Sequence, residues 1–153
     1  MMLNQYFQIF LPPIEAELSS VIDQANGPGL SDLHYMLSYA MGWVGPGAGP
    51  ETRGKRIRPV LVLLTTAAAG GQWQVSIPAA AAVELIHNFS LIHDDIEDQS
   101  DQRRGRPTVW KQWSIAQATN AGDALFALAH LELLRLADSL PYSIVVKAAQ
   151  LLN

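Results

Sequence analysis

The sequence contains no cysteine among its 153 residues. Disulfide bridges and thiolate metal sites are therefore excluded, which fits a reducing compartment. Basic residues are also few, with 10 Lys and Arg against 14 Asp and Glu and a net charge of −4. This balance provides neither the broad basic surface typical of nucleic-acid binding nor the cationic face of a membrane-surface protein. Any attraction for phosphate groups must come from local clusters of Lys and Arg.

The N-terminal stretch, residues 1–13, has no basic residue ahead of its apolar run, which argues against a signal peptide. The long uncharged stretch, residues 59–83, is interrupted by Gly70, Gly71 and Pro78. This punctuation favours two apolar helices joined by a turn over a membrane span. We therefore predict a cytoplasmic protein with no membrane span and no nucleic-acid partner.

Apolar residues make up 49 % of the chain, which is enough for a sizeable buried core. They recur at helical spacing, and no run alternates with the period of a β-strand. The pattern predicts one all-α domain over residues 1–153, with Ser31 or Asp32 capping the second helix. Residues 99–107 are predicted to be a loop or a fraying helix end. The predicted helices cover about residues 13–24, 31–41, 57–69, 78–98, 116–136 and a last segment after Pro141.

An acidic cluster ends the fourth predicted helix. Asp94 and Asp98 are four residues apart, so their carboxylates share one face of the helix about one turn apart. They repel each other there, and the helix macrodipole disfavours anions at this end. A bound cation would remove both costs, and oxygen ligands of this kind suit Mg²⁺. The alternative is a solvated helix end, against which the apolar approach from Phe89 to His93 argues.

Two basic clusters accompany the acids. Lys55 and Arg58 lie three residues apart at a predicted helix start and can converge on one anion. Arg103, Arg104 and Arg106 follow the acidic cluster, and a guanidinium binds phosphate through two parallel hydrogen bonds. Together, acids and arginines predict a site for a metal-bound diphosphate. Ordinary surface cations and a surface salt-bridge network are the alternatives.

Read together, these segments resemble the trans-isoprenyl diphosphate synthase family, also called polyprenyl synthetases. The resemblance covers about residues 54–136. It rests on motifs in family order: Gly54-Lys-Arg-Ile-Arg-Pro59, Glu84-Leu-Ile-His87, Asp94-Asp-Ile-Glu-Asp98 with Arg103-Arg104-Gly105, and Gly122-Asp-Ala-Leu-Phe126. It implies the N-terminal half of an antiparallel helix bundle of the isoprenoid synthase type. It also implies Mg²⁺-dependent, head-to-tail transfer of an allylic prenyl group to isopentenyl diphosphate, in a homodimer.

The resemblance also assigns roles to individual residues. The diphosphate of isopentenyl diphosphate is expected to contact Lys55, Arg58, His87 and Arg104. The resemblance makes Asp94 and Asp98 the direct Mg²⁺ ligands, supported by Asp95, and makes Arg103 the contact to the allylic diphosphate. Phe89 occupies the position that faces the growing hydrocarbon tail, where an aromatic favours a short product. This suggests geranylgeranyl or farnesyl diphosphate, and the alternative for Phe89 is an ordinary core aromatic.

Family members are much longer and carry a second aspartate-rich motif, which is absent after Asp98 in this chain. We therefore expect the chain alone to bind a single Mg²⁺ at most and to show little or no catalysis. It is either a fragment of a full enzyme or a natural half-length protein. A non-catalytic partner that binds prenyl diphosphate or regulates a full-length synthase is the second hypothesis. A terpene cyclase is disfavoured, because such enzymes do not bind the isopentenyl diphosphate that residues 54–59 are expected to hold.

Overall fold

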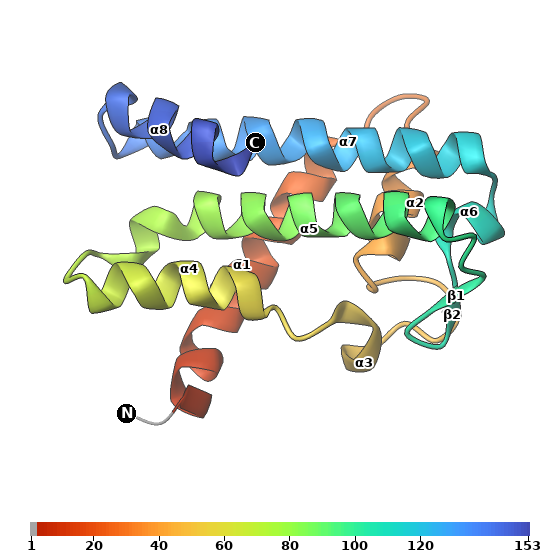
Figure 1. Cartoon of the computed structure of the whole chain (residues 1–153), viewed down its shortest axis with the longest axis horizontal. Coiled ribbons are helices and arrows are strands. Elements are labelled where there is room, and N and C mark those ends of the chain that lie inside the picture. The colour runs from red at the N-terminus through yellow and green to blue at the C-terminus, as the bar shows by residue number, and fades with distance from the viewer. Residues whose placement is uncertain (1–2) are drawn as a thin grey trace. The chain divides into compact units, whose positions relative to one another are not determined.

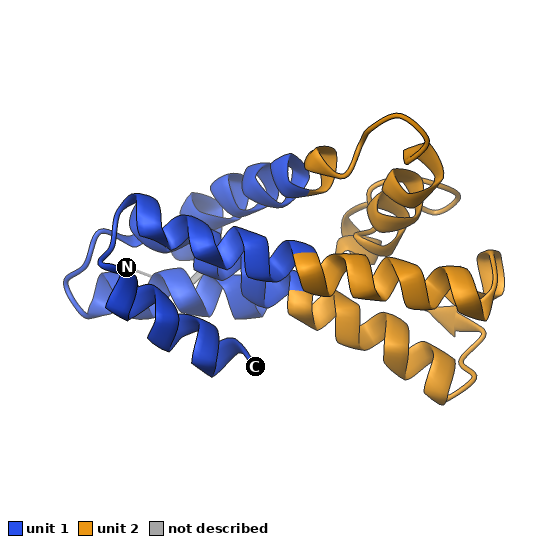
Figure 2. Ribbon diagram, turned by 90° about the horizontal axis from the view of Figure 1, so that it is seen from above, with its two compact units in different colours: residues 1–21, 56–85, 128–153 blue, residues 22–55, 86–127 orange. Residues whose placement is uncertain are grey.

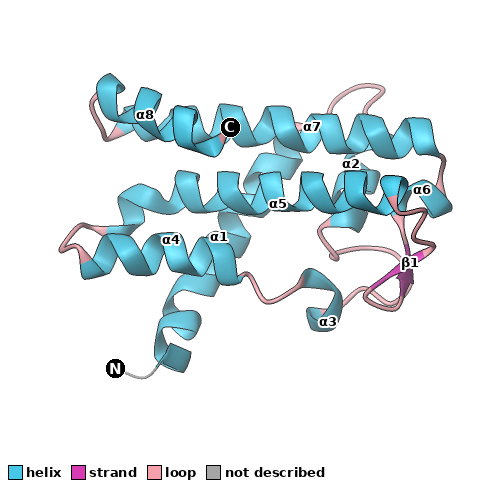
Figure 3. Ribbon diagram, in the orientation of Figure 1, coloured by secondary structure: helices cyan, strands magenta, loops and turns pink. Residues whose placement is uncertain are grey.

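The computed structural model describes residues 3–153, and almost all of its regular structure is helical (Figures 1 and 3). The predicted all-α fold is confirmed, with one two-stranded hairpin added. The elements are α1 (Leu3–Gln24), α2 (Ser31–Ala40), α3 (Pro50–Arg53), α4 (Ile57–Ala68), the 3₁₀ helix η1 (Trp73–Ser76), α5 (Ile77–Glu97), β1 (Gln102–Arg103), β2 (Arg106–Pro107), α6 (Val109–Gln112), α7 (Ile115–Leu134), η2 (Arg135–Asp138) and α8 (Tyr142–Leu152).

The chain forms two compact units (Figure 2). The first unit contains the chain up to Val21 together with residues 56–85 and 128–153, and the second contains residues 22–55 and 86–127. The long helices α1, α5 and α7 each contribute to both units. Most residues of the predicted site therefore fall in the second unit, and Arg58 falls in the first.

The first unit is built on apolar faces that recur at helical spacing. Phe10, Ile14 and Leu18 of α1 are at most 1 % exposed, as the period of a buried helix face requires. Val60 and Leu63 of α4 are equally buried. The core of this unit therefore follows directly from the apolar pattern of its helices.

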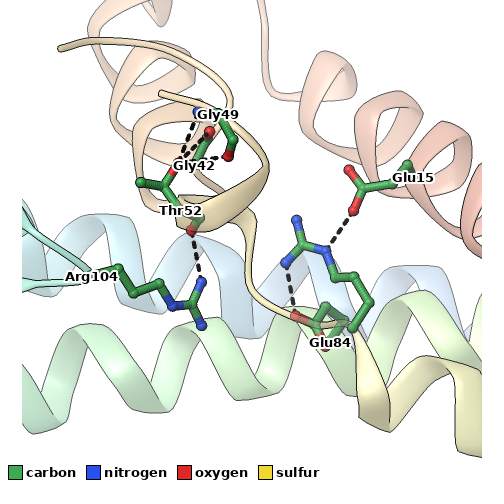
Figure 4. Close-up of polar contacts among 7 residues, drawn as sticks. Glu15, Gly42, Gly49, Thr52, Glu84 and Arg104 are labelled. Carbon is green, nitrogen blue, oxygen red and sulfur yellow. Dashed lines mark hydrogen bonds and ion pairs between the residues drawn. The ribbon is translucent and has the colours of Figure 1, made fainter. Parts of the chain in front are cut away.

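A buried ion-pair group lies beside that core. Arg56 is 3 % exposed, and its guanidinium bonds Glu15 (Nε–Oε1 2.6 Å) and Glu84 (Nη1–Oε1 2.8 Å). Figure 4 shows both carboxylates turned towards this guanidinium. Arg56 adopts a left-handed backbone conformation, with φ 49°, directly before α4. Two carboxylates around one guanidinium compensate its buried charge, so the group joins α1, the start of α4 and α5 within this unit.

The predicted start of the first helix at Pro13 is wrong. Helix α1 begins at Leu3 and passes through both Pro12 and Pro13. Prolines inside a helix remove a backbone hydrogen bond and introduce a clash. Packing offsets that cost here: Phe10, in the turn before them, is buried with its ring centroid 5.1 Å from that of Trp73. The apolar period that identifies the helix thus outweighs the local signal of proline.

The ends of the helices correct a second expectation. Ser31 is the first residue of α2, and Leu30 precedes it without a side-chain cap, so neither Ser31 nor Asp32 is the cap. Helix α2 ends instead in a motif closed by Gly42 at φ 82°: Gly42 N donates to Tyr39 O and Trp43 N to Ser38 O. This Schellman pattern uses a left-handed residue to satisfy the last carbonyl groups.

The predicted turn between two apolar helices is present as residues 69–76, between α4 and α5. Within the described residues, the stretch Trp73–Glu97 is nevertheless long and apolar enough to cross a membrane, with a mean hydropathy of 1.5. Length and composition are weak evidence, because the core helix of a folded domain passes the same test. The absence of a membrane span stays a prediction.

Candidate functional site

The acidic cluster occupies the last turn of α5 in the second unit. Asp98 continues that turn beyond Glu97, because its backbone N–H donates to the Asp94 carbonyl at 2.8 Å. Both aspartate side chains are exposed. Within the described part of the chain, neither carboxylate has a hydrogen-bond or ion-pair partner. The geometry therefore leaves two carboxylates on one exposed helix face.

Asp95 points the other way and is 4 % exposed. The Arg103 guanidinium binds the Asp95 carboxylate: Nε lies 3.0 and 2.9 Å from its two oxygens, and Nη2 lies 2.8 Å from Oδ1. Hydrogen bonding to Asp95, opposed by burial and assisted by the charges of Asp94 and Asp98, raises the pKa of Arg103. The bidentate pair compensates the buried carboxylate of Asp95. It also leaves Nη1 of Arg103 without a hydrogen bond to any described residue.

The segment predicted as a loop contains a β-hairpin. Strands β1 and β2 pair antiparallel, with Arg103 opposite Arg106. The two residues between them, Arg104 and Gly105, have φ values of 52° and 73°, as in a type I′ turn. Glycine after a polar residue is the sequence signal for such a turn. Sequence patterns did not reveal the hairpin, because each of its strands has only two residues. The hairpin fixes where its arginines point.

Arg104 reaches back to the segment that carries Lys55. Its Nη1 donates to the Thr52 carbonyl at 2.8 Å (Figure 4). The guanidinium lies so close to Gly54 that a Cβ on that glycine would be 2.8 Å from both Nη1 and Nη2. Gly54 also has φ 78°, which suits glycine. Arg104 is thus held against the chain segment that carries the exposed Lys55.

The other predicted contacts are placed as follows. His87 lies on α5, half-buried, and Ser90 Oγ donates to its carbonyl at 2.8 Å. Arg58 is exposed in the first turn of α4, in the first unit. The structure therefore gathers Lys55, Arg103, Arg104 and the aspartates within one unit, whereas Arg58 belongs to the other.

A small cavity opens beneath the hairpin in the second unit, with about 50 Å³ of solvent-accessible space. Its polar lining includes Tyr39, Asn88 and Asp95 together with Arg103, Arg104 and Arg106. Sequence reasoning placed Arg106 in the basic cluster but gave it no individual role. The structure shows it 6 % exposed, and no carboxylate within the described residues pairs with it.

Phe89 lies in an aromatic cluster between α5 and α7. Its ring centroid is 5.1 Å from that of Phe126 and 4.6 Å from the His93 ring. One turn along, Gly122 faces His93, where a Cβ would lie 2.4 Å from Nε2. Contacts 89 to 126 and 93 to 122 run in opposite directions, so these helix segments pack antiparallel. Glycine at position 122 permits this close approach.

The donor set fits a hard divalent cation held jointly by protein and substrate. No group of three or more His, Cys, Asp or Glu side chains with metal-binding geometry occurs among the described residues. Asp94 and Asp98 present carboxylate oxygens on one exposed face, and no other described residue competes for them. Mg²⁺ commonly keeps several waters and takes one or two carboxylates plus substrate phosphates. Asp94 and Asp98 could therefore supply carboxylate ligands to such an ion.

Comparison with known proteins identifies the family to which this helical chain belongs. Residues 49–152 match the family model for polyprenyl synthetase. The chain belongs to the polyprenyl synthetase family and corresponds to the N-terminal portion of its members.

Curated relatives include a (2E,6E)-farnesyl diphosphate synthase of Mycobacterium tuberculosis, 48 % identical over 101 residues, which are 65 % of this chain and 28 % of the relative. A geranylgeranyl diphosphate synthase of the same organism is 40 % identical over 116 residues, 74 % of this chain and 33 % of the relative. The chain thus spans about a third of the length of these relatives.

Solved structures share the fold. A geranyltransferase from Legionella pneumophila superposes with a TM-score of 0.79 at 36 % identity, over 94 % of this chain and 47 % of that chain. A polyprenyl synthetase from Streptomyces coelicolor gives 0.77 at 37 % identity, over 89 % and 40 %. The predicted family and fold class are confirmed.

Proposed function

We propose that this chain provides the N-terminal part of a prenyltransferase that adds isopentenyl diphosphate head-to-tail to an allylic diphosphate. The observation that carries the proposal is the different environments of the three aspartates at the end of α5. Asp95 is buried against Arg103, whereas Asp94 and Asp98 remain exposed without a partner among the described residues. These two carboxylates repel each other one helical turn apart, and a bound cation would relieve that repulsion.

The arginine hairpin supports the roles of the substrate contacts. Arg103 keeps Nη1 available while Asp95 orients its plane, so it can hold an oxygen of the allylic diphosphate. Arg104 joins the Lys55 segment, which supports a shared contact to the diphosphate of isopentenyl diphosphate. His87 and Arg58 complete that contact in the proposal, and for Arg58 the argument rests on its motif position alone.

In the proposed reaction the allylic diphosphate departs, the isopentenyl double bond attacks the allylic cation, and a proton is lost. Arg103 stabilises the charge that develops on the departing diphosphate, and Arg104 with Lys55 orients the second substrate. Asp94 and Asp98 would hold Mg²⁺, which supplies further stabilisation of the leaving diphosphate. No side-chain nucleophile is required, in agreement with the absence of cysteine.

The product is proposed to be farnesyl or geranylgeranyl diphosphate. Both products occur among the names of the relatives. Phe89 lies on α5 five residues before Asp94, and its ring packs against Phe126 of α7 at 5.1 Å between centroids. In this proposal an aromatic at that position limits the length of the growing chain. A cytoplasmic location, without membrane insertion or nucleic acid, belongs to the same proposal.

The chain alone is proposed to have little or no activity. A second candidate, a non-catalytic partner of a full-length synthase, is favoured by the exposed apolar side chains of the first unit. Leu131, Leu134, Tyr142, Val146 and Leu151 are between 53 and 87 % exposed. Exposed apolar side chains in this number on α7 and α8 favour contact with another protein, where they form a continuous surface. The same surface would serve the homodimer that the family resemblance implies.

Magnesium-dependent incorporation of labelled isopentenyl diphosphate into farnesyl diphosphate tests the proposal, together with calorimetric binding of the allylic substrate farnesyl diphosphate in the presence of Mg²⁺. Asp94→Ala is the test variant, and Glu97→Gln is the matched control, because Glu97 is an exposed acid in the same turn. We expect Mg²⁺-dependent binding that Asp94→Ala abolishes and Glu97→Gln preserves. Turnover by the chain alone would refute its inactivity, and binding unaffected by Asp94→Ala would refute the site.

A further inference from the structure

Arg106 lies in a closely fitted environment in the second unit. Its guanidinium carbon is 3.9 Å from the centroid of the Tyr39 ring, and Nη2 donates to the Val44 carbonyl at 2.6 Å. The Tyr39 hydroxyl in turn donates to the Pro107 carbonyl at 2.8 Å, so Tyr39 also binds the backbone of the strand that carries Arg106. The other side of the Tyr39 environment is filled by the Trp113 ring, at 5.1 Å between centroids. Stacking and hydrogen bonding therefore hold Arg106 in place, and no carboxylate of the described residues pairs with it.

The loop of residues 41–49 wraps around this side chain. A Cβ on Gly45 would lie 2.8 Å from the Tyr39 ring and 3.1 Å from Arg106 Nη2, and one on Gly47 would lie 3.4 Å from Arg106 Cγ. Both glycines have positive φ, at 83° and 73°. The sequence Gly45-Pro46-Gly47 therefore lets the backbone approach Arg106 to a distance that a larger residue would prevent.

The two ends of this loop are joined to each other. Thr52 Oγ1 donates to the Gly42 carbonyl at 3.1 Å, and a Cβ on Gly42 would lie 2.6 Å from the Thr52 carbonyl group. The Thr52 carbonyl also accepts the hydrogen bond from Arg104. The hairpin thus holds the loop at two points: Arg106 binds its middle and Arg104 its exit, three residues before Lys55.

We propose that Arg106 is a positioning residue, which fixes the 102–107 hairpin against the 41–49 loop so that Arg104 and Lys55 face the same diphosphate. Arg106 itself is buried among Tyr39 and the loop and makes no contact with the substrate in this proposal. The inference rests on the proposed function of Lys55 and Arg104. It assigns an individual role to a residue for which the sequence offered only membership of a basic cluster.

Arg106→Lys tests the inference, because lysine retains the charge but lacks the planar fork that stacks and hydrogen-bonds together. Tyr39→Leu is a second variant that removes the ring beneath the guanidinium. Lys147→Gln is the charge control, since Lys147 is exposed in α8 of the first unit. The measurements are calorimetric binding of isopentenyl diphosphate with Mg²⁺ and hydrogen exchange of the Trp43, Thr52 and Arg53 amides in the 153-residue chain.

We expect Arg106→Lys and Tyr39→Leu to raise the Kd about tenfold or more, and to accelerate exchange at these three amides. Thermal midpoints close to that of the wild type would exclude a general loss of structure. Unchanged binding and unchanged exchange in a folded Arg106→Lys protein would overturn the inference. If the wild type binds no diphosphate, the proposed function fails, while the exchange measurement still decides whether Arg106 holds the loop.

Discussion

Arg103 binds Asp95 through two nitrogen atoms, eight residues along the chain and across the end of α5, at 2.8 to 3.0 Å. Of the three aspartates in the acidic cluster, Asp95 is buried in this ion pair, whereas Asp94 and Asp98 stay exposed. One salt bridge therefore fixes the first guanidinium of the hairpin and separates Asp95 from the two exposed aspartates.

Asp95→Asn should lower the free energy of unfolding by about 1–3 kcal/mol, because it leaves the Arg103 guanidinium facing a neutral amide. Arg103 is 37 % exposed, so water replaces part of the lost interaction and the effect stays below that of a fully buried pair. Asp94→Asn, at an exposed position in the same turn, should change stability by less than about 0.5 kcal/mol. Urea unfolding of the three proteins measures the difference, and equal effects of the two substitutions would contradict the structural role of the pair.

Gly122→Ala should destabilise the protein by about 1–3 kcal/mol, although alanine is the better helix former. The added Cβ would lie 2.4 Å from His93 Nε2, so the partly buried imidazole would have to leave its position between α5 and α7 in the second unit. Combining Gly122→Ala with His93→Ala removes the obstacle and should recover most of the loss. A double-mutant cycle in urea measures this coupling, and strictly additive effects would show that the contact is not responsible.

Glu132 should make stability fall as the pH rises through neutrality. Burial and the neighbouring Glu17 raise its pKa to about 7, despite the opposing effect of Arg135. The folded state therefore retains a proton that the unfolded chain releases near pH 4.5. Its stabilising contribution is complete below that pH and is lost as the pH rises through 7, at up to about 1.4 kcal/mol per pH unit.

Unfolding by urea between pH 4.5 and 8 checks this dependence for Glu132. In Glu132→Gln a neutral amide replaces the protonated acid, so the difference from the wild type isolates this one group from other titrations. We expect the variant to lose less stability than the wild type over that interval. A parallel decline in both proteins would contradict the assignment.

Gln99→Gly should raise the free energy of unfolding by roughly 0.5–1 kcal/mol. Gln99 has φ 52° at the end of α5, where Gln99 N donates to Ile96 O and Ser100 N to Asp95 O. Glycine occupies the equivalent left-handed position after α2, at Gly42. Gly42→Ala is the opposite control and should be strongly destabilising, since its Cβ would meet the Thr52 backbone at 2.6 Å. Thermal unfolding measures whether Gln99→Gly raises the melting temperature and Gly42→Ala lowers it.

The sequence alone determined the helical fold, the positions of its main helices and the presence of two aspartates on one helix face. These features are local, because apolar period and residue spacing act within a few turns of one helix. The start of α4 at Ile57 and the turn before α5 followed from the same signals. Local reasoning erred at Pro12 and Pro13, where the burial of Phe10 outweighed the local cost of proline.

Only the tertiary structure decided how the charged residues are used. Nothing in the spacing of Arg103, Arg104 and Arg106 indicates that one pairs with Asp95, one with the Thr52 carbonyl and one with the Tyr39 ring. These partners lie 8, 52 and 67 residues away in sequence. Long-range partners of flexible side chains depend on which backbones packing brings together, and that outcome is set by the whole core rather than by any local pattern.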